Sequence, residues 1–301
     1  MAMTLLTLCV VSPPPLTPCA RAEKPLAVDA STAFSDRLLA LTRRLQAVST
    51  GEKNGFRRSI GILRESVTPQ DSLTFREHAV DVWLQSYYER AMTRGDLLEA
   101  LGVSQPLNRS SQLSAIRRQV RPLGFEAHVE DGAVAQIPRF SLLRRRLGDL
   151  AGPAWRSYWA LQAEEIDRPL EIEGLPAVPW DQMRRRLTAR EQFLTLYPHF
   201  VRRRDVDCER EWILLDYVGA LDPAVLADSR QRPRADALAS YALFLERNRD
   251  SHSFGLIRDY RRLLLGQGDK LDVAAVRAFL DAQNLPKPSF RAASSGEASP
   301  E

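Results

Sequence analysis

Serine and arginine side chains gather on the polar face of a helix that the sequence predicts over residues 111 to 121. The face carries Ser114, Arg117, Arg118 and Arg121, and Ser110 directly precedes the helix. Guanidinium and hydroxyl groups bind phosphate oxygens and can also reach the edges of bases. These five residues are therefore candidates for contacts with a nucleic acid.

Positive charge is concentrated around this helix. From Arg94 to Arg146 there are nine arginines and five acidic residues, a surplus equal to the net charge of +4 of the whole chain. The chain is mildly basic, with a pI of about 9.1, which permits an anionic partner without requiring one. Arginine greatly outnumbers lysine, and its planar fork suits phosphate. A GC-rich genome also favours arginine codons, so this composition has a second explanation.

Three arginine triplets occur at residues 144–146, 184–186 and 202–204. Consecutive helix positions spread around the axis, so one triplet cannot form a single stripe. The first triplet follows the predicted hairpin closely in sequence, which makes Arg144 and Arg145 further candidates for phosphate contacts. We expect the other two triplets to be solvated, with their aliphatic stems covering neighbouring apolar residues.

Residue patterns typical of enzymes are sparse. None of the four histidines pairs with another at metal-ligand spacing, and the chain has neither a phosphate-binding loop nor a Gly-x-Ser-x-Gly motif. We therefore predict no catalytic residue, no metal and no cofactor.

Apolar spacing predicts a mainly α fold with one β-hairpin and a C-terminal multi-helix bundle. The hairpin is expected at residues 125–137, where Asp131-Gly132 supplies a tight turn between alternating apolar residues. Residues 49–58 are polar and loop-like, and the proline-containing residues 167–179 should form an extended connection. Helices are expected at 32–48, 70–93, 95–102, 111–121, 155–166, 180–187, 188–200, 207–221, 234–247, 253–265 and 272–283.

The order of elements from residue 70 to residue 137 resembles a winged helix-turn-helix DNA-binding domain. The resemblance implies that the helix at 111–121 enters the major groove of duplex DNA and that the hairpin is the wing. It covers about a quarter of the chain. The connection at 103–110 is about twice as long as the turn usual in that family. The same order of elements also fits a helical domain with one hairpin and a solvated basic face.

Composition shifts suggest four segments. We expect residues 1–28 to be a disordered leader or a signal peptide with a cleavage site after Ala22, and residues 287–301 to be a disordered tail. Gly152-Pro153 separates a helical domain at 29–151, which contains the winged-helix-like unit, from a second at 152–286.

Two functions follow from these observations. One is a cytoplasmic bacterial DNA-binding protein, either a regulator or an accessory DNA-processing factor, whose C-terminal half mediates self-association or contact with a partner. The alternative is an exported, periplasmic helical protein with a binding or structural role and no catalytic activity. No apolar run is long enough to predict membrane insertion.

Trp212 belongs to an apolar block, 212–218, that should be buried. Alternatively, Trp212 lies in an exposed patch for a partner or a second subunit.

Overall fold

The computed structural model describes residues 32–49, 54–89, 110–130, 133–172, 175–283 and 285. Its residues form two compact units. Unit 1 contains the described residues up to Arg168 together with Leu196–Asp205. Unit 2 contains Pro169–Thr195 and the described residues from Val206 onward.

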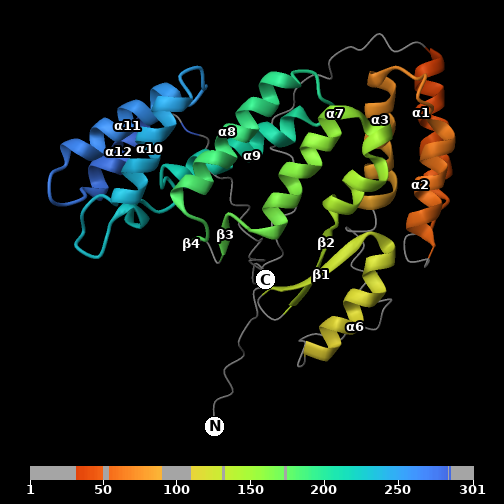
Figure 1. Cartoon of the computed structure of the whole chain (residues 1–301), viewed down its shortest axis with the longest axis horizontal. Helices are drawn as coiled ribbons and strands as arrows, with labels where there is room; N and C mark the ends of the chain where they lie inside the picture. The colour runs from red at the N-terminus through yellow and green to blue at the C-terminus, as the bar shows by residue number, and fades with distance from the viewer. Residues whose placement is uncertain are drawn as a thin grey trace, which may run out of the picture. The chain divides into compact units, whose positions relative to one another are not determined.

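Unit 1 is helical with one β-hairpin, and Figure 1 shows its elements from red to green. Helix α3 continues directly into a π-helix, η1, and helix α6 into a short 3-10 helix, η2. The elements are α1 (Thr32–Gln46), α2 (Gly55–Ser66), α3 (Leu73–Trp83), η1 (Leu84–Glu89), α6 (Ser110–Val120), η2 (Arg121–Leu123), β1 (Phe125–Glu130), β2 (Ala133–Pro138) and α7 (Phe140–Asp167).

Helix α3 lies at the centre of unit 1, where it packs against α1, α2 and α7. Its apolar residues recur at helical spacing, so Phe75, Ala79 and Trp83 are all buried. Ser72 caps the start of the helix, because its hydroxyl accepts a hydrogen bond from Phe75 N at 3.2 Å. The Trp83 indole donates to the hydroxyl of Ser59 on α2 at 3.1 Å, so the polar edge of this buried ring is also satisfied.

Helix α7 is kinked at the position where the sequence predicts a domain boundary. Gly152 has φ 83° and ψ 178°, and Pro153 follows it. A Cβ atom at Gly152 would lie 2.5 Å from Leu73 Cδ1, so glycine suits both the backbone angle and the close packing. Both halves of α7 belong to unit 1, and the division between the units comes later, at Arg168. Gly152-Pro153 is therefore a bend inside a unit.

Unit 2 is built mainly from helices that pack around one apolar core. Helix α10 packs against α11, and α11 packs against α12 (Figure 1, in blue). A two-residue antiparallel pair of strands, β3 with β4, lies in the connection that leads into α8. The elements are β3 (Glu171–Ile172), β4 (Leu175–Pro176), α8 (Trp180–Leu196), α9 (Arg203–Tyr217), η3 (Pro223–Leu226), α10 (Ala235–Arg247), α11 (Phe254–Gly266) and α12 (Val273–Ala282).

Tyrosine hydroxyls complete the C-terminal end of α9 inside this core. The last carbonyls of a helix have no partner within the helix itself. Tyr241 donates to Tyr217 O and Tyr260 donates to Val218 O, both at 2.6 Å. All three tyrosines are buried, and desolvation raises the pKa of the Tyr241 and Tyr260 hydroxyls, so they remain donors.

The predicted fold class is confirmed in the described part of the chain, which is mainly helical and contains the expected hairpin. The strands pair antiparallel, from Phe125↔Pro138 to Glu130↔Ala133. The turn at Asp131-Gly132 and the expected helix at 95–102 lie outside the described residues. No helix in the described segments is both long and apolar enough to cross a membrane.

Two local predictions are wrong. Residues 55–58 do not belong to a loop but open α2, and the buried Phe56, Ser59 and Leu63 lie along one side of that helix. The helices expected at 180–187 and 188–200 are one helix, α8, which ends at Leu196. Thr188 and Glu191, three residues apart, form the capping-box pattern that predicts a helix start at residue 188, but both lie in the middle of α8.

The predicted solvation of the later arginine triplets holds for Arg185 and Arg203, which are exposed, and is wrong for Arg184, Arg186 and Arg202. Arg186 is fully buried, and the buried Arg184 donates to Asp181 Oδ1 from Nε at 3.0 Å and from Nη2 at 2.7 Å. In unit 1, Arg202 is largely buried and forms ion pairs with Asp81 and Glu89. For Arg184 and Arg202 the burial of charge is tolerated because each guanidinium is paired with a carboxylate.

The apolar block on α9 is buried as predicted, except at its first residue. Ile213, Leu214, Leu215, Tyr217 and Val218 are buried, whereas Trp212 keeps 38% of its surface exposed. The expected burial therefore does not extend to Trp212, and the alternative that this residue lies in a patch for a partner or a second subunit stays a prediction.

Candidate nucleic-acid interface

Helix α6 is held by one face and exposes the other. Ile116 and Val120, four residues apart, are buried, and Leu123 of η2 extends this apolar side. Ser114 and Arg118, also four residues apart, are exposed. Amphipathic spacing thus fixes which side chains of α6 face outward.

The outward face is anchored to the hairpin through Glu126 of β1. The Glu126 carboxylate lies 3.0 Å from Arg121 Nε and 3.5 Å from Arg117 Nε. Arg117 Nε also donates to Ala127 O at 3.0 Å. These contacts connect α6 to β1. They also partly neutralise the charge of Arg117 and Arg121, two of the residues predicted to contact phosphate.

Arg118 differs from Arg117 and Arg121, which both contact Glu126. Its side chain is exposed, and it forms no ion pair within the described parts of the chain. Arg121 keeps 56% of its side chain exposed in spite of its contact with Glu126. Ser114, Arg118 and Arg121 are spaced by four and then three residues, so they lie along one side of the helix that α6 and η2 form.

The base of the hairpin is fixed to the aromatic core of unit 1 by Tyr88. The Tyr88 hydroxyl donates to Gly124 O and accepts from Arg139 N, the latter at 3.0 Å. Its ring stacks on Phe125 with centroids 4.6 Å apart. Burial raises the pKa of the Tyr88 hydroxyl, which keeps it protonated and able to donate. One side chain thus holds both ends of the hairpin.

The turn between η2 and β1 depends on Gly124. Its φ of 92° lies in the left-handed region, which favours glycine. A Cβ atom at this position would approach the Phe56 ring to 2.6 Å. Gly124 therefore lets the chain reverse directly over the first turn of α2.

The other predicted site residues are distributed as follows. Arg144 and Arg145 are exposed near the start of α7, and neither has an ion-pair partner among the described residues. Ser110 is the first residue of α6, and the contacts of its side chain lie outside the described structure. The structure brings Arg117 and Arg121 together on Glu126, and it places Arg144 and Arg145 on a different helix.

Sequence reasoning missed two residues that position this surface. The sequence predicts a helix around Tyr88 but no role for its hydroxyl, because its two backbone partners, Gly124 and Arg139, lie far along the chain. Phe56 falls in a segment whose polar composition predicts a loop, but the i, i+4, i+7 spacing of Phe56, Ile60 and Leu63 indicates a helix.

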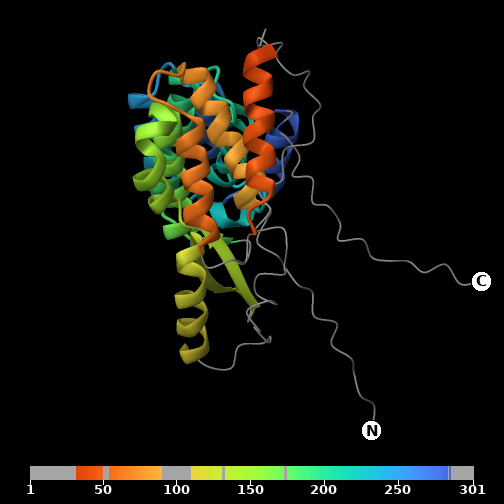
Figure 2. The same cartoon turned by 90° about the vertical axis from the view of Figure 1, so that its right-hand side faces the viewer.

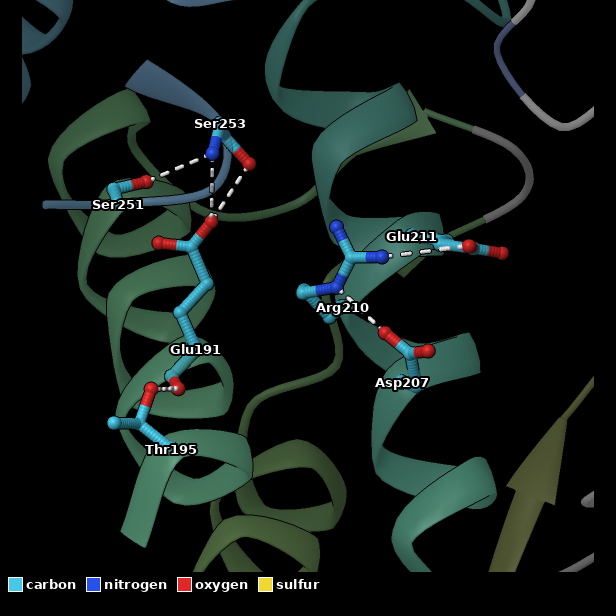
Figure 3. A network of polar contacts seen from close by, with 7 residues as sticks. All are labelled: Glu191, Thr195, Asp207, Arg210, Glu211, Ser251 and Ser253. Carbon is cyan, nitrogen blue, oxygen red and sulfur yellow. Dashed lines mark hydrogen bonds and ion pairs between the residues drawn. The ribbon is translucent and has the colours of Figure 1, made fainter. Parts of the chain in front are cut away.

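A second network of polar side chains lies in unit 2 (Figure 3). Glu191 Oε1 accepts from Ser253 Oγ at 2.7 Å and from Ser253 N at 3.2 Å, and Ser251 Oγ also accepts from Ser253 N. Arg210 donates to Asp207 Oδ1 at 2.8 Å and to Glu211 Oε1 at 3.4 Å. Glu191 thus binds the residue before α11, which explains why it does not cap a new helix in α8.

This network has a structural role. Ser253 is buried, and one oxygen of Glu191 accepts hydrogen bonds from both its hydroxyl and its backbone N–H, so the carboxylate fixes the start of α11. In the described structure, no three histidine, cysteine, aspartate or glutamate side chains gather in a way that could hold a metal ion. The basic surface around α6 is the stronger candidate for a functional site.

No family model, curated protein or solved structure matches this chain. Its function therefore has to be inferred from its own residues.

Proposed function

We propose that this protein binds duplex DNA through α6 and the β1–β2 hairpin, in the manner of a winged helix-turn-helix domain. The observation that carries the proposal is the exposed side of α6 and η2, with Ser114, Arg118 and Arg121 in line. The major groove of DNA is wide enough to admit an α-helix, and arginine and serine reach its base edges and phosphates. Such a protein acts as a regulator or as an accessory DNA-processing factor.

The anchoring of the hairpin supports the same proposal. A wing positions its domain on the duplex only if it is held rigidly against the recognition helix. Here β1 is fixed to α6 through Glu126, and both ends of the hairpin are fixed to Tyr88. Arg144 and Arg145, on the helix that follows the hairpin, add exposed positive charge for phosphate contacts.

Replacing Arg118 with alanine tests the proposal, because this side chain is exposed and no contact with the described residues depends on it. Each phosphate contact that is lost should reduce the slope of log affinity against log salt by about one. Fluorescence anisotropy with duplex DNA at several salt concentrations measures this slope. Arg247→Ala removes the same charge from an exposed position in unit 2, and it should leave the slope unchanged.

Failure of the wild-type protein to bind duplex DNA at low salt would reject the proposal. An equal loss of slope in Arg118→Ala and Arg247→Ala would show that net charge alone, rather than α6, drives binding.

Access to chromosomal DNA implies a cytoplasmic location, and the exported alternative makes a different prediction. Cleavage after Ala22 would give a mature protein that begins at Glu23. The mass of the native protein distinguishes the two, and a native chain that begins at Glu23 would favour a periplasmic binding or structural role.

A further inference from the structure

The first turn of α2 lies against the end of the proposed recognition helix. Phe56 packs under Gly124, and α2 and η2 are neighbours in unit 1. Figure 2 shows the start of α2, in orange, meeting the end of α6, in yellow, and the same approach is visible in Figure 1. Residues that are more than 60 positions apart in the sequence thus form one junction.

The α2 side of this junction is basic. Arg57 and Arg58 directly follow Phe56, and both are exposed. Between Gly55 and Arg64, helix α2 contains no acidic residue. Arg57 forms no ion pair with any residue that the structure describes. Across the junction, Arg121 opens η2 and is more than half exposed.

We propose that the duplex-binding surface continues from η2 onto the first turn of α2, where Arg57 and Arg58 contact the phosphate backbone. This inference rests on the proposed function of α6. The major groove is about 12 Å wide, so an element that abuts one end of a helix in the groove meets the phosphates at its border. Contacts of this kind fix the register of the protein on the duplex and carry no sequence information.

Charge density favours duplex DNA over an acidic protein as the partner of this surface. Duplex DNA carries one phosphate charge per ~1.7 Å of its axis, so several arginines on two adjoining elements can each find a phosphate. The planar guanidinium group of arginine also matches the geometry of a phosphate better than the compact ammonium group of lysine does. An acidic polypeptide would need its carboxylates placed to fit both elements.

The test uses the full chain and the double variant Arg57→Ala/Arg58→Ala. Its salt slope for duplex DNA should be lower by about two, to the same extent for duplexes of unrelated sequence. Arg57→Lys/Arg58→Lys should retain most of the slope, because the charge remains. Arg247→Ala/Arg249→Ala removes two exposed charges from unit 2 and should leave the slope unchanged.

An unchanged slope in Arg57→Ala/Arg58→Ala, with a reduced slope in Arg118→Ala, would overturn this inference and leave the proposed function intact. Loss of slope for only one duplex sequence would also overturn it, because a backbone contact does not discriminate. Wild-type protein that binds polyglutamate but not duplex DNA would overturn both proposals and point to an acidic protein partner.

Discussion

Glu126 is the residue that most directly modulates the basic surface. Its carboxylate lies between Arg117 and Arg121 and occupies the kind of position a phosphate would take. It fastens the hairpin to α6, and it also competes with any anion that approaches the two arginines. Such half-exposed ion pairs contribute little to stability, on the order of 1 kcal/mol or less, so the electrostatic effect should dominate in binding.

Replacing Glu126 with glutamine should therefore tighten duplex binding. The variant keeps the shape of the side chain, removes the negative charge that partly neutralises Arg117 and Arg121, and should steepen the salt slope by about one. Anisotropy titration measures this effect. Glu65→Gln makes the same charge change at an exposed carboxylate that pairs with Arg44, and it serves as the control. Weaker binding by Glu126→Gln would show that the anchoring of the hairpin matters more than the charge it neutralises.

At the scale of elements, the helices of unit 1 are joined by polar contacts at their connections. Asp71, in the turn between α2 and α3, accepts from Arg37 of α1 at 2.7 Å and from Thr68 N at 2.7 Å. These contacts, with the Arg37 hydrogen bond as the largest cause, lower the pKa of Asp71 from 3.8 to about 2. The folded protein therefore favours the ionised form of the Asp71 carboxyl group.

The stability that Asp71 contributes should depend on pH. Because its pKa is lower in the folded state, the contribution is present above about pH 4 and is lost as the pH falls toward 2. Asp71→Asn should destabilise unit 1 at neutral pH by roughly 1 kcal/mol or less, because Arg37 is about half exposed. Urea denaturation should show the difference from wild type shrinking as the pH is lowered to about 3. A difference independent of pH would contradict the role of the charge.

At the scale of the whole molecule, each unit has an apolar core of its own. Unit 1 is organised around Trp83 and Tyr88, and unit 2 around the helices that bury Tyr217, Tyr241 and Tyr260. The proposed DNA surface lies entirely in unit 1. Changes to the surface of unit 2 are therefore expected to leave DNA affinity unchanged, unless they disturb self-association.

Trp212→Ala should lower the free energy of unfolding by about 1 to 2 kcal/mol, compared with roughly 3 to 5 kcal/mol for an enclosed ring. The smaller loss follows from the exposed third of the side chain. Chemical denaturation measures the change, and sedimentation of both proteins reports their oligomeric state. Unchanged stability together with a loss of self-association would show instead that Trp212 lies in an interface between copies.

The sequence by itself determined the mainly helical fold, the hairpin and the outward face of α6. These depend on local properties: the helical spacing of apolar residues, their alternation along the hairpin strands and the preference of arginine for the surface of an amphipathic helix. Ser114 and Arg118 are exposed and Ile116 and Val120 are buried for this local reason. The same local rules failed for Arg202, because its burial depends on Asp81, a carboxylate that is distant in the sequence.

Only the tertiary structure decided which residues that are far apart in the sequence contact one another. The contacts of Tyr88 with Gly124 and Arg139, and of Phe56 with Gly124, join segments that are 36 to 68 positions apart. Glu191 likewise resembles a capping residue in sequence, but in the fold it binds Ser253, which is 62 positions away. Local spacing cannot specify such pairings, because they arise only when the cores assemble and bring separate helices into contact.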